Sequence, residues 1–109
     1  MESERRRAPR YQFISDAEVI EIEFVTWFKA STGDLSIGGC FLDTQNPSAE
    51  GTVIRVTISR GSTEFTGLGR VVFVFPRLGM GVAFTNASES QIAVLEDWLA
   101  EFSLNKTSK

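Results

Sequence analysis

The chain has 109 residues, of which 42% are hydrophobic and 23% are charged, a balance typical of one folded globular domain. It carries a formal net charge of −3 at pH 7 and contains one cysteine and no histidine. These counts exclude an internal disulfide, a cysteine-rich zinc site and catalysis through a histidine relay, so an enzyme is the least favoured class of protein.

No apolar run approaches the roughly 18–20 residues that a membrane-spanning helix needs. The first seven residues are mostly charged and no apolar stretch follows them, which differs from the pattern of a secretory signal. Together with the unpaired Cys40, this predicts a cytoplasmic protein without membrane insertion.

Positive charge is concentrated at the amino terminus, in an arm that we define as residues 1–12. The arginines of this arm are Arg5, Arg6, Arg7 and Arg10. Against two glutamates they give the first ten residues a charge of +2, which leaves −5 for the other 99 residues. An acidic body disfavours a general DNA or RNA binder, because counterion release requires a broad basic surface. The arm is therefore either a solvated tail or the holder of one small anionic ligand.

Residues 13–86 have the pattern of a small antiparallel β-barrel. The run from Ile20 to Phe24 alternates apolar and acidic residues, as a strand with one solvated face does, and a turn is expected near 24–26. Further β-rich runs follow, and Gly67 and Gly69 within one of them indicate a bend or a close approach of two backbones. Turn-forming residues separate the strands at 31–34, 38–39, 46–51, 60–62 and 76–79.

The period then changes to that of a helix, predicted over residues 87–103. Ser88 and Gln91 fit a capping box at its start. The apolar residues that recur at helical spacing are Ile92, Leu95, Trp98, Leu99 and Phe102. We expect this amphipathic helix to cover one end or flank of the barrel, and residues 104–109 to form a frayed tail of the same single domain.

The arginine pair Arg6-x-x-x-Arg10 is the first motif with ligand-binding chemistry. A guanidinium is a planar fork of donors that binds phosphate oxygens in pairs and matches the O6 and N7 acceptors of guanine. With Arg5 and Arg7 beside them, these side chains could hold both a phosphate and a purine. The alternative is a solvated tail, since pairs at this spacing also arise by chance.

The second motif is Asp34-x-Ser36-x-x-Gly39. A carboxylate accepts hydrogen bonds from N1 and N2 of a guanine edge, and a hydroxyl two residues further lies on the same strand face, where it can reach a phosphate. Gly39 lets a ligand approach the backbone or adopts a positive φ angle. The alternative is an ordinary hairpin corner, in which Asp, Ser and Gly are all common.

Together these two motifs resemble the signature of the PilZ family, R-x-x-x-R followed a few tens of residues later by [D/N]-x-S-x-x-G. The run Gly79-Met80-Gly81-Val82-Ala83-Phe84 is also similar to the family's last strand. The resemblance covers nearly the whole chain. It implies a bacterial protein with a six-stranded antiparallel β-barrel and a C-terminal helix that binds the second messenger cyclic di-GMP.

The resemblance also implies a binding site, with no cofactor beyond the messenger itself. Its residues are Arg5, Arg6, Arg7, Arg10, Asp34, Ser36, Gly38 and Gly39. The arginines would clamp guanine and phosphate from the arm, the acid and the hydroxyl would meet the other edge from the barrel, and the two glycines would leave space for the ligand.

Two positions in the resemblance concern ligand number and stacking. In family members the residue before the arginine pair affects whether one ligand or a stacked pair binds, and Arg5 at this position favours an intercalated dimer of cyclic di-GMP. Many members carry a Trp in the fifth strand near the site, whereas this chain has Phe73. Phe73 offers a stacking face, but packing in the core is the favoured interpretation.

The remaining notable residues suggest structural roles. Cys40 lies in an apolar context and is expected to act as a small buried hydrophobe. Trp27 is either a core residue or an exposed anchor for a partner. Arg60, like the scattered Arg55, Arg70 and Arg77, is expected on a solvated strand face or turn.

The function that these features favour is a non-catalytic receptor. Cyclic di-GMP would order the arm against the barrel and so change a surface that an unidentified downstream protein contacts. The alternatives are an adaptor of the same fold that binds no ligand, and an oligonucleotide-binding barrel. The second is disfavoured, because the cations cluster on the arm and are not interleaved with aromatic residues on the strands.

Overall fold

Alternation of apolar and polar residues folds most of the chain into strands. The structure is a computed structural model that describes residues 9–107, with side chains to residue 102. In chain order the elements of this part are β1 (Tyr11–Gln12), β2 (Asp16–Glu21), β3 (Thr26–Ser36), β4 (Gly39–Asp43), β5 (Val53–Arg60), β6 (Thr63–Phe75), β7 (Gly79–Asn86) and α1 (Glu89–Thr107).

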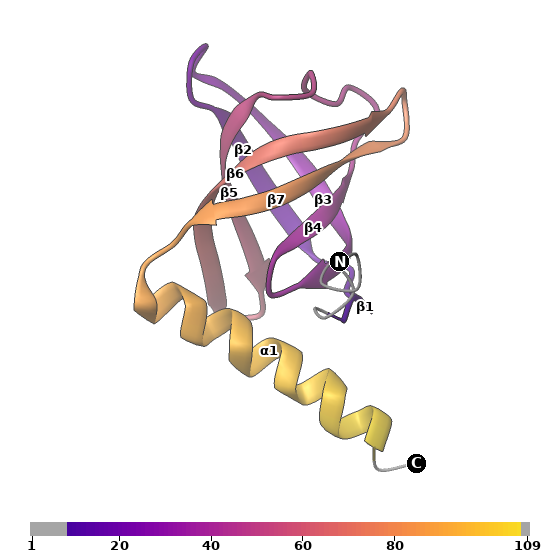
Figure 1. Ribbon diagram of the computed structural model, residues 1–109, viewed down its shortest axis with the longest axis vertical. Coiled ribbons are helices and arrows are strands. Elements are labelled where there is room, and N and C mark those ends of the chain that lie inside the picture. The colour runs from indigo at the N-terminus through magenta and orange to yellow at the C-terminus, as the bar shows by residue number, and fades with distance from the viewer. Residues whose placement is uncertain (1–8, 108–109) are drawn as a thin grey trace, which may run out of the picture.

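Strands β2 to β7 close into a barrel in which every pairing is antiparallel. Their order is β3-β2-β5-β6-β7-β4, and β4 pairs back with β3. The short β1 continues the line of β2 along the same edge of β3. Helix α1 lies across one end of the barrel (Figure 1). The expected six-stranded antiparallel barrel with one C-terminal helix is confirmed.

The core lies inside the barrel and is made of the side chains that point inward at alternate positions along the strands. The largest fully buried side chains are Phe65, Leu35, Leu42, Ile54, Ile58, Met80 and Leu95. Thr32 is also buried, and its hydroxyl donates to the carbonyl of Phe13 and accepts the N–H of Ser15 at 2.9 Å. These hydrogen bonds provide partners for backbone groups in the segment between β1 and β2, which is not part of a strand.

Residues 31–34 do not form the predicted turn but lie within the 11-residue β3. These residues form a β-bulge instead, because the pairing of β3 with β4 shifts register between Thr32 and Asp34. The chain reverses later, at Ile37 and Gly38, in agreement with the second predicted break. The turn expected near 24–26 occupies 22–25, and Val25 adopts a φ of 55° in it.

The helix and the arm both differ from their predicted limits. Helix α1 begins within the predicted range but extends to Thr107, through residues expected to fray. The end of the arm is also structured, because Tyr11 and Gln12 form β1 against β3. Ser88 accepts the backbone N–H of Gln91 at 3.3 Å, as the capping box predicts. The Gln91 side chain, however, accepts the N–H of Thr66 at 2.6 Å and so ties the helix to β6.

Within residues 9–107, no helix is both long enough and apolar enough to span a membrane.

Candidate ligand-binding site

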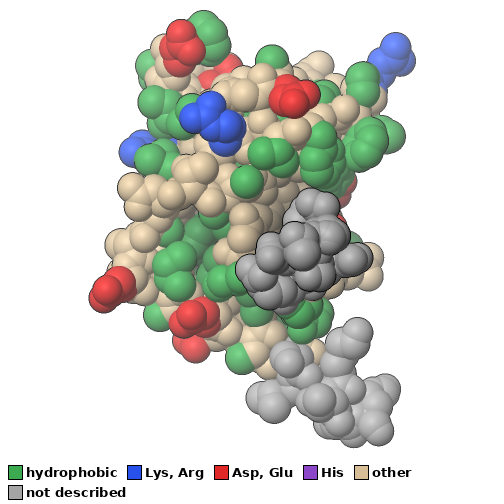
Figure 2. All heavy atoms as spheres, in the orientation of Figure 1, with side chains coloured by type: hydrophobic (Ala, Val, Ile, Leu, Met, Phe, Trp, Pro, Cys, Tyr) green, Lys and Arg blue, Asp and Glu red, His purple; other side chains and the backbone are tan. Residues whose placement is uncertain are grey.

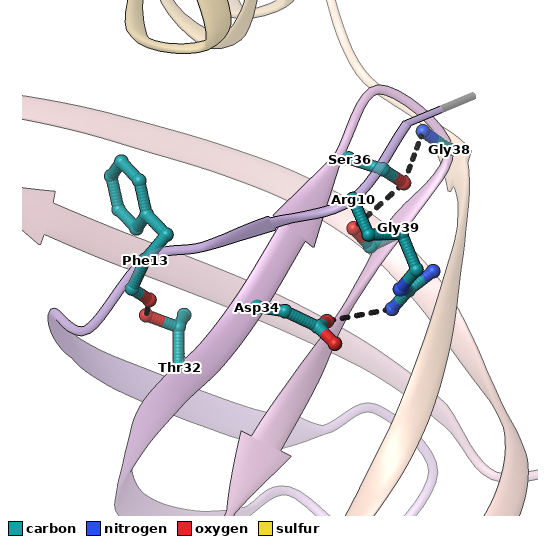
Figure 3. A network of polar contacts seen from close by, with 7 residues as sticks. All are labelled: Arg10, Phe13, Thr32, Asp34, Ser36, Gly38 and Gly39. Atoms are coloured by element: carbon teal, nitrogen blue, oxygen red, sulfur yellow. Dashed lines mark hydrogen bonds and ion pairs between the residues drawn. The ribbon is translucent and has the colours of Figure 1, made fainter. Parts of the chain in front are cut away.

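The two motifs meet at the end of β3. Arg10 directly precedes β1, and β1 pairs with β3 so that Gln12 lies opposite Asp34. This register brings the Arg10 guanidinium to the Asp34 carboxylate, with Nη2 at 2.7 Å from Oδ1 (Figure 3). The two side chains are 47% and 37% exposed, so the ion pair lies at the surface, where a ligand can reach it. Residues 24 positions apart in the sequence thus form one contact.

Ser36 is positioned differently from the prediction. Its side chain is buried, with 1% of the residue exposed. The hydroxyl accepts the N–H of Gly38 at 3.2 Å and donates to the carbonyl of Gly39 at 3.3 Å (Figure 3). In this structure the hydroxyl therefore holds the β3–β4 turn, a role that the alternative of a hairpin corner would also give it.

Gly39 is required by the approach of a neighbouring strand. A Cβ atom built there would lie 2.1 Å from the backbone carbonyl oxygen of Val82 in β7, whereas one built at Gly38 would meet nothing within 4 Å. The hypothesis that Gly39 adopts a positive φ angle is wrong, since Gly51 and Gly61 are the glycines with that conformation in residues 9–107. Gly38 is the glycine that leaves open space beside the site.

Aromatic side chains cover the barrel surface next to Asp34. Phe41 lies opposite Asp34 in the β3–β4 pairing, and its ring stacks with that of Phe73 at 6.2 Å and 24°. Phe75 contacts Phe73 edge to face at 5.4 Å. Gly81 of β7 pairs with both Phe41 and Phe73, so no side chain separates the two rings. We call Phe41, Phe73 and Phe75 the aromatic platform.

The favoured interpretation of Phe73 as a core residue is wrong. Phe65, Gly67, Gly69 and Val71 alternate inward, and the same period would bury position 73. A register shift between Val71 and Phe73 reverses the alternation, which leaves Phe73 42% exposed on the outer surface. A bulge of this kind depends on the partner strand, so the period of the sequence alone does not reveal it.

Arg5, Arg6 and Arg7 lie outside the described residues, so Arg10 is the arginine of the arm that the structure places. No group of three or more carboxylate or thiol side chains suited to hold a metal ion occurs between residues 9 and 102. Cys40 is fully buried behind the site, as predicted. Burial, together with the nearby charge of Asp34, raises the pKa of its thiol to about 12, against a smaller opposing effect of the charge of Arg10.

Arg60 lies at the exposed end of β5, with 40% of its side chain exposed, which agrees with the expected solvated strand face or turn, but it also has partners that the sequence did not indicate. Its guanidinium binds Glu101 of α1 at 2.6 Å and lies 5.5 Å and 5.6 Å from the ring centres of Phe13 and Phe102. Tyr11 of β1 also stacks on Phe102, at 6.1 Å. The arm and the barrel therefore both contact the helix at the ring of Phe102. The partners are 41 or more residues from Arg60, so sequence patterns carried no signal of this cluster.

The fold is a six-stranded antiparallel β-barrel with one C-terminal helix, and comparison with known families identifies the class to which it belongs. The family model described as PilZ domain matches residues 4–101, and the chain belongs to this family. Domains of this family are typically non-catalytic binding modules. No curated protein matches the chain in sequence.

Solved structures share the fold at low sequence identity. The PilZ domain of YcgR from Escherichia coli, solved with c-di-GMP, has a TM-score of 0.73 and 15% identity over 96% of this chain and 98% of that one. The K. pneumonia MrkH–c-di-GMP complex has a TM-score of 0.78 and 18% identity over 95% of this chain but 55% of that one. The PilZ domain of CeSA from a cellulose-synthesizing bacterium has a TM-score of 0.69 and 16% identity, over 87% and 98%.

Proposed function

We propose that this chain is a bacterial receptor for cyclic di-GMP, in which the ligand closes the arginine arm onto the barrel. The observation that carries the proposal is the contact between Arg10 and Asp34, which joins the two halves of the family motif at an exposed position. Two structural relatives are described as complexes with the same nucleotide, although at 15% and 18% identity they support the fold more than the ligand.

The chemistry of this contact suits a guanine nucleotide. The Asp34 carboxylate can accept N1–H and N2–H of a guanine edge, while arginine forks bind the O6 and N7 acceptors and the phosphates. An exposed ion pair contributes only about 0–1 kcal/mol, so a ligand that makes several charge-assisted hydrogen bonds can displace or share it. Arg10 would then turn from Asp34 to the ligand.

The other arginines of the arm extend this proposal. Arg6 completes the pair that clamps the ligand, Arg5 favours an intercalated dimer of cyclic di-GMP, and Arg7 adds charge for its additional phosphates. Gly38 leaves space at the turn. Ser36 contributes by holding that turn in place, and reaches a phosphate only if its bond to the Gly39 carbonyl opens.

The signal would leave the domain through a surface that the closed arm alters, for contact with a downstream protein. A ligand-blind adaptor of the same fold is the second candidate. The observation in its favour is that the Ser36 hydroxyl already has two partners within the turn, while Trp27 is 53% exposed and available to another protein. The interpretation of Trp27 as a core residue is thereby excluded.

Calorimetric titration tests the proposal. We expect heat on adding cyclic di-GMP at micromolar concentration and none with cyclic di-AMP, which lacks the guanine edge. Arg6→Ala and Arg10→Ala should abolish detectable binding and leave the melting temperature of the free protein nearly unchanged, because the ion pair of Arg10 is exposed. Arg55→Ala, which removes another exposed arginine, is the matched control.

The outcomes separate the candidates. The absence of heat with the unmodified chain would favour the adaptor. Equal loss of binding in Arg55→Ala would show a general charge effect instead of a site. In the same titrations, Arg5→Ala should lower the stoichiometry towards one ligand per chain, and an unchanged ratio of two would show that Arg5 does not set it.

A further inference from the structure

Two hairpin tips lie at the end of the barrel remote from α1, on opposite sides of that end (Figure 1). The first, between β2 and β3, is named the acidic tip and consists of Ile22, Glu23, Phe24 and Val25. The second, at the turn from β6 to β7, is named the basic tip and consists of Phe75, the last residue of β6, and the turn residues Pro76, Arg77 and Leu78. Neither tip contains Arg10 or Asp34, although Phe75 of the basic tip also belongs to the aromatic platform.

Both tips expose large apolar side chains. Phe24 and Val25 of the acidic tip, and Phe75 and Leu78 of the basic tip, are each more than half exposed. Hydrophobic side chains also gather below the basic tip, at the upper right of the molecule (Figure 2). Contiguous exposed apolar surface of this kind marks contact with another macromolecule.

The backbone of each tip is strained at one residue. Val25 has a φ of 55° and Arg77 a φ of 65°, the left-handed conformation that glycine adopts most easily. A β-branched residue such as valine is rarely found there. Strain of this type concentrates where function retains it, and here it directs an apolar and a cationic side chain away from the barrel.

The tips carry opposite charge. Glu23 is the charged residue of one and Arg77 of the other, and neither forms an ion pair with any residue from 9 to 102. The nearby Glu21 differs from Glu23, because its carboxylate accepts a hydrogen bond from the hydroxyl of Ser48. Each tip therefore combines exposed apolar surface with one charge that would find its complement on the other tip.

We propose that two copies of this chain associate end to end through these tips. A two-fold axis that passes between them places the acidic tip of one copy on the basic tip of its partner, and the same contact occurs a second time. Both apolar surfaces are then covered, and both charges are paired. Stable dimers cover about 800 Å² on each partner. Two hairpin tips form a smaller contact, so the dimer is weak and depends on concentration. This association is independent of the proposed ligand.

Sedimentation velocity from micromolar to millimolar concentration tests the proposal. We expect a monomer–dimer equilibrium for the unmodified chain. Glu23→Arg and Arg77→Glu should each raise the dissociation constant at least about tenfold, because each puts like charges together at both contacts. The double variant, and an equimolar mixture of the two single variants, should recover dimer formation. Glu64→Arg, on an exposed side chain at the opposite end of the barrel, is the control.

A chain that stays monomeric at every concentration would overturn the proposal, and would leave the tips to a different protein. A dimer that both single variants retain, or that the double variant fails to recover, would show that the tips do not face one another. Thermal unfolding of each variant verifies that a lost dimer does not reflect a lost fold. The cyclic di-GMP titration is unaffected by these substitutions, so it can fail or succeed separately.

Discussion

At the scale of single residues, the second motif serves the fold as well as any ligand. Gly39 lies where β7 approaches β4, and Ser36 holds the turn between β3 and β4. The Asp34 side chain, in contrast, is 37% exposed and forms an ion pair with Arg10 of the arm. We therefore expect substitutions within one motif to have different consequences, some on stability and others on ligand binding.

Gly39→Ala should unfold the domain partly or fully. The added methyl group would meet the carbonyl oxygen of Val82. Because the backbone of β4 fixes the position of the methyl group and the oxygen belongs to the backbone of β7, the two strands must separate. We expect a loss of at least about 1–3 kcal/mol, measured by urea denaturation. Gly38→Ala is the matched control, with a change within about 0.5 kcal/mol, because its Cβ would meet open space. Equal effects of the two would contradict the packing of β4 on β7.

At the scale of elements, helix α1 is attached to the barrel at two places. Gln91 accepts the N–H of Thr66 near its start, and Arg60 binds Glu101 near its end. Between them, Leu95 and Trp98 are buried against the barrel, which explains why a 19-residue helix with an exposed acidic face forms here. The arm joins the same cluster, since Tyr11 stacks on Phe102, and Phe13 just after the arm contacts Trp98 at 5.2 Å and Phe102 at 5.5 Å.

Arg60→Ala should weaken the attachment of the helix. The ion pair with Glu101 is largely exposed and contributes little, but the guanidinium also lies over Phe13 and Phe102. We expect a loss of about 1 kcal/mol in the free energy of unfolding, with Arg60→Lys intermediate because lysine keeps the charge and loses the plane. Hydrogen exchange should become faster in α1 and β1. An unchanged exchange rate in α1 would show that Arg60 is not needed to hold it.

At the scale of the whole molecule, the candidate site and the helix are connected through the arm. Arg10 contacts Asp34, Tyr11 stacks on Phe102, and Phe13 packs on Trp98. A stretch of four residues therefore touches both the candidate site and the helix. A ligand that moves Arg10 therefore acts on the helix through a short stretch of chain. This gives the proposed receptor a physical route from nucleotide to surface.

The fluorescence of Trp98 should report this movement. In a Trp27→Phe variant, Trp98 is the remaining tryptophan, and we expect cyclic di-GMP to change its emission over the concentration range in which calorimetry detects binding. Arg10→Ala in the same background should show neither heat nor a change in emission. Binding with constant emission would contradict the route through the arm and the helix.

Much of the fold follows from the period of the sequence. The positions of the later strands, the turns at 60–62 and 76–79 and the start of the helix agree with the structure to within a few residues. Local chemistry explains this agreement, because alternation, turn residues and a capping serine act over a few neighbouring residues. The paired motif likewise singles out Arg10 and Asp34, two residues that the fold brings into contact.

What the sequence by itself determined is therefore the family, the class of fold and the chemistry offered to a ligand, all of which depend on local order along the chain. The tertiary structure decided which residues share a surface. It turned residues 31–34 into part of a strand, placed Phe73 outside the barrel and drew Arg60 to the helix. Each of these depends on strand register or on contacts between distant segments, and such contacts arise only when the barrel closes.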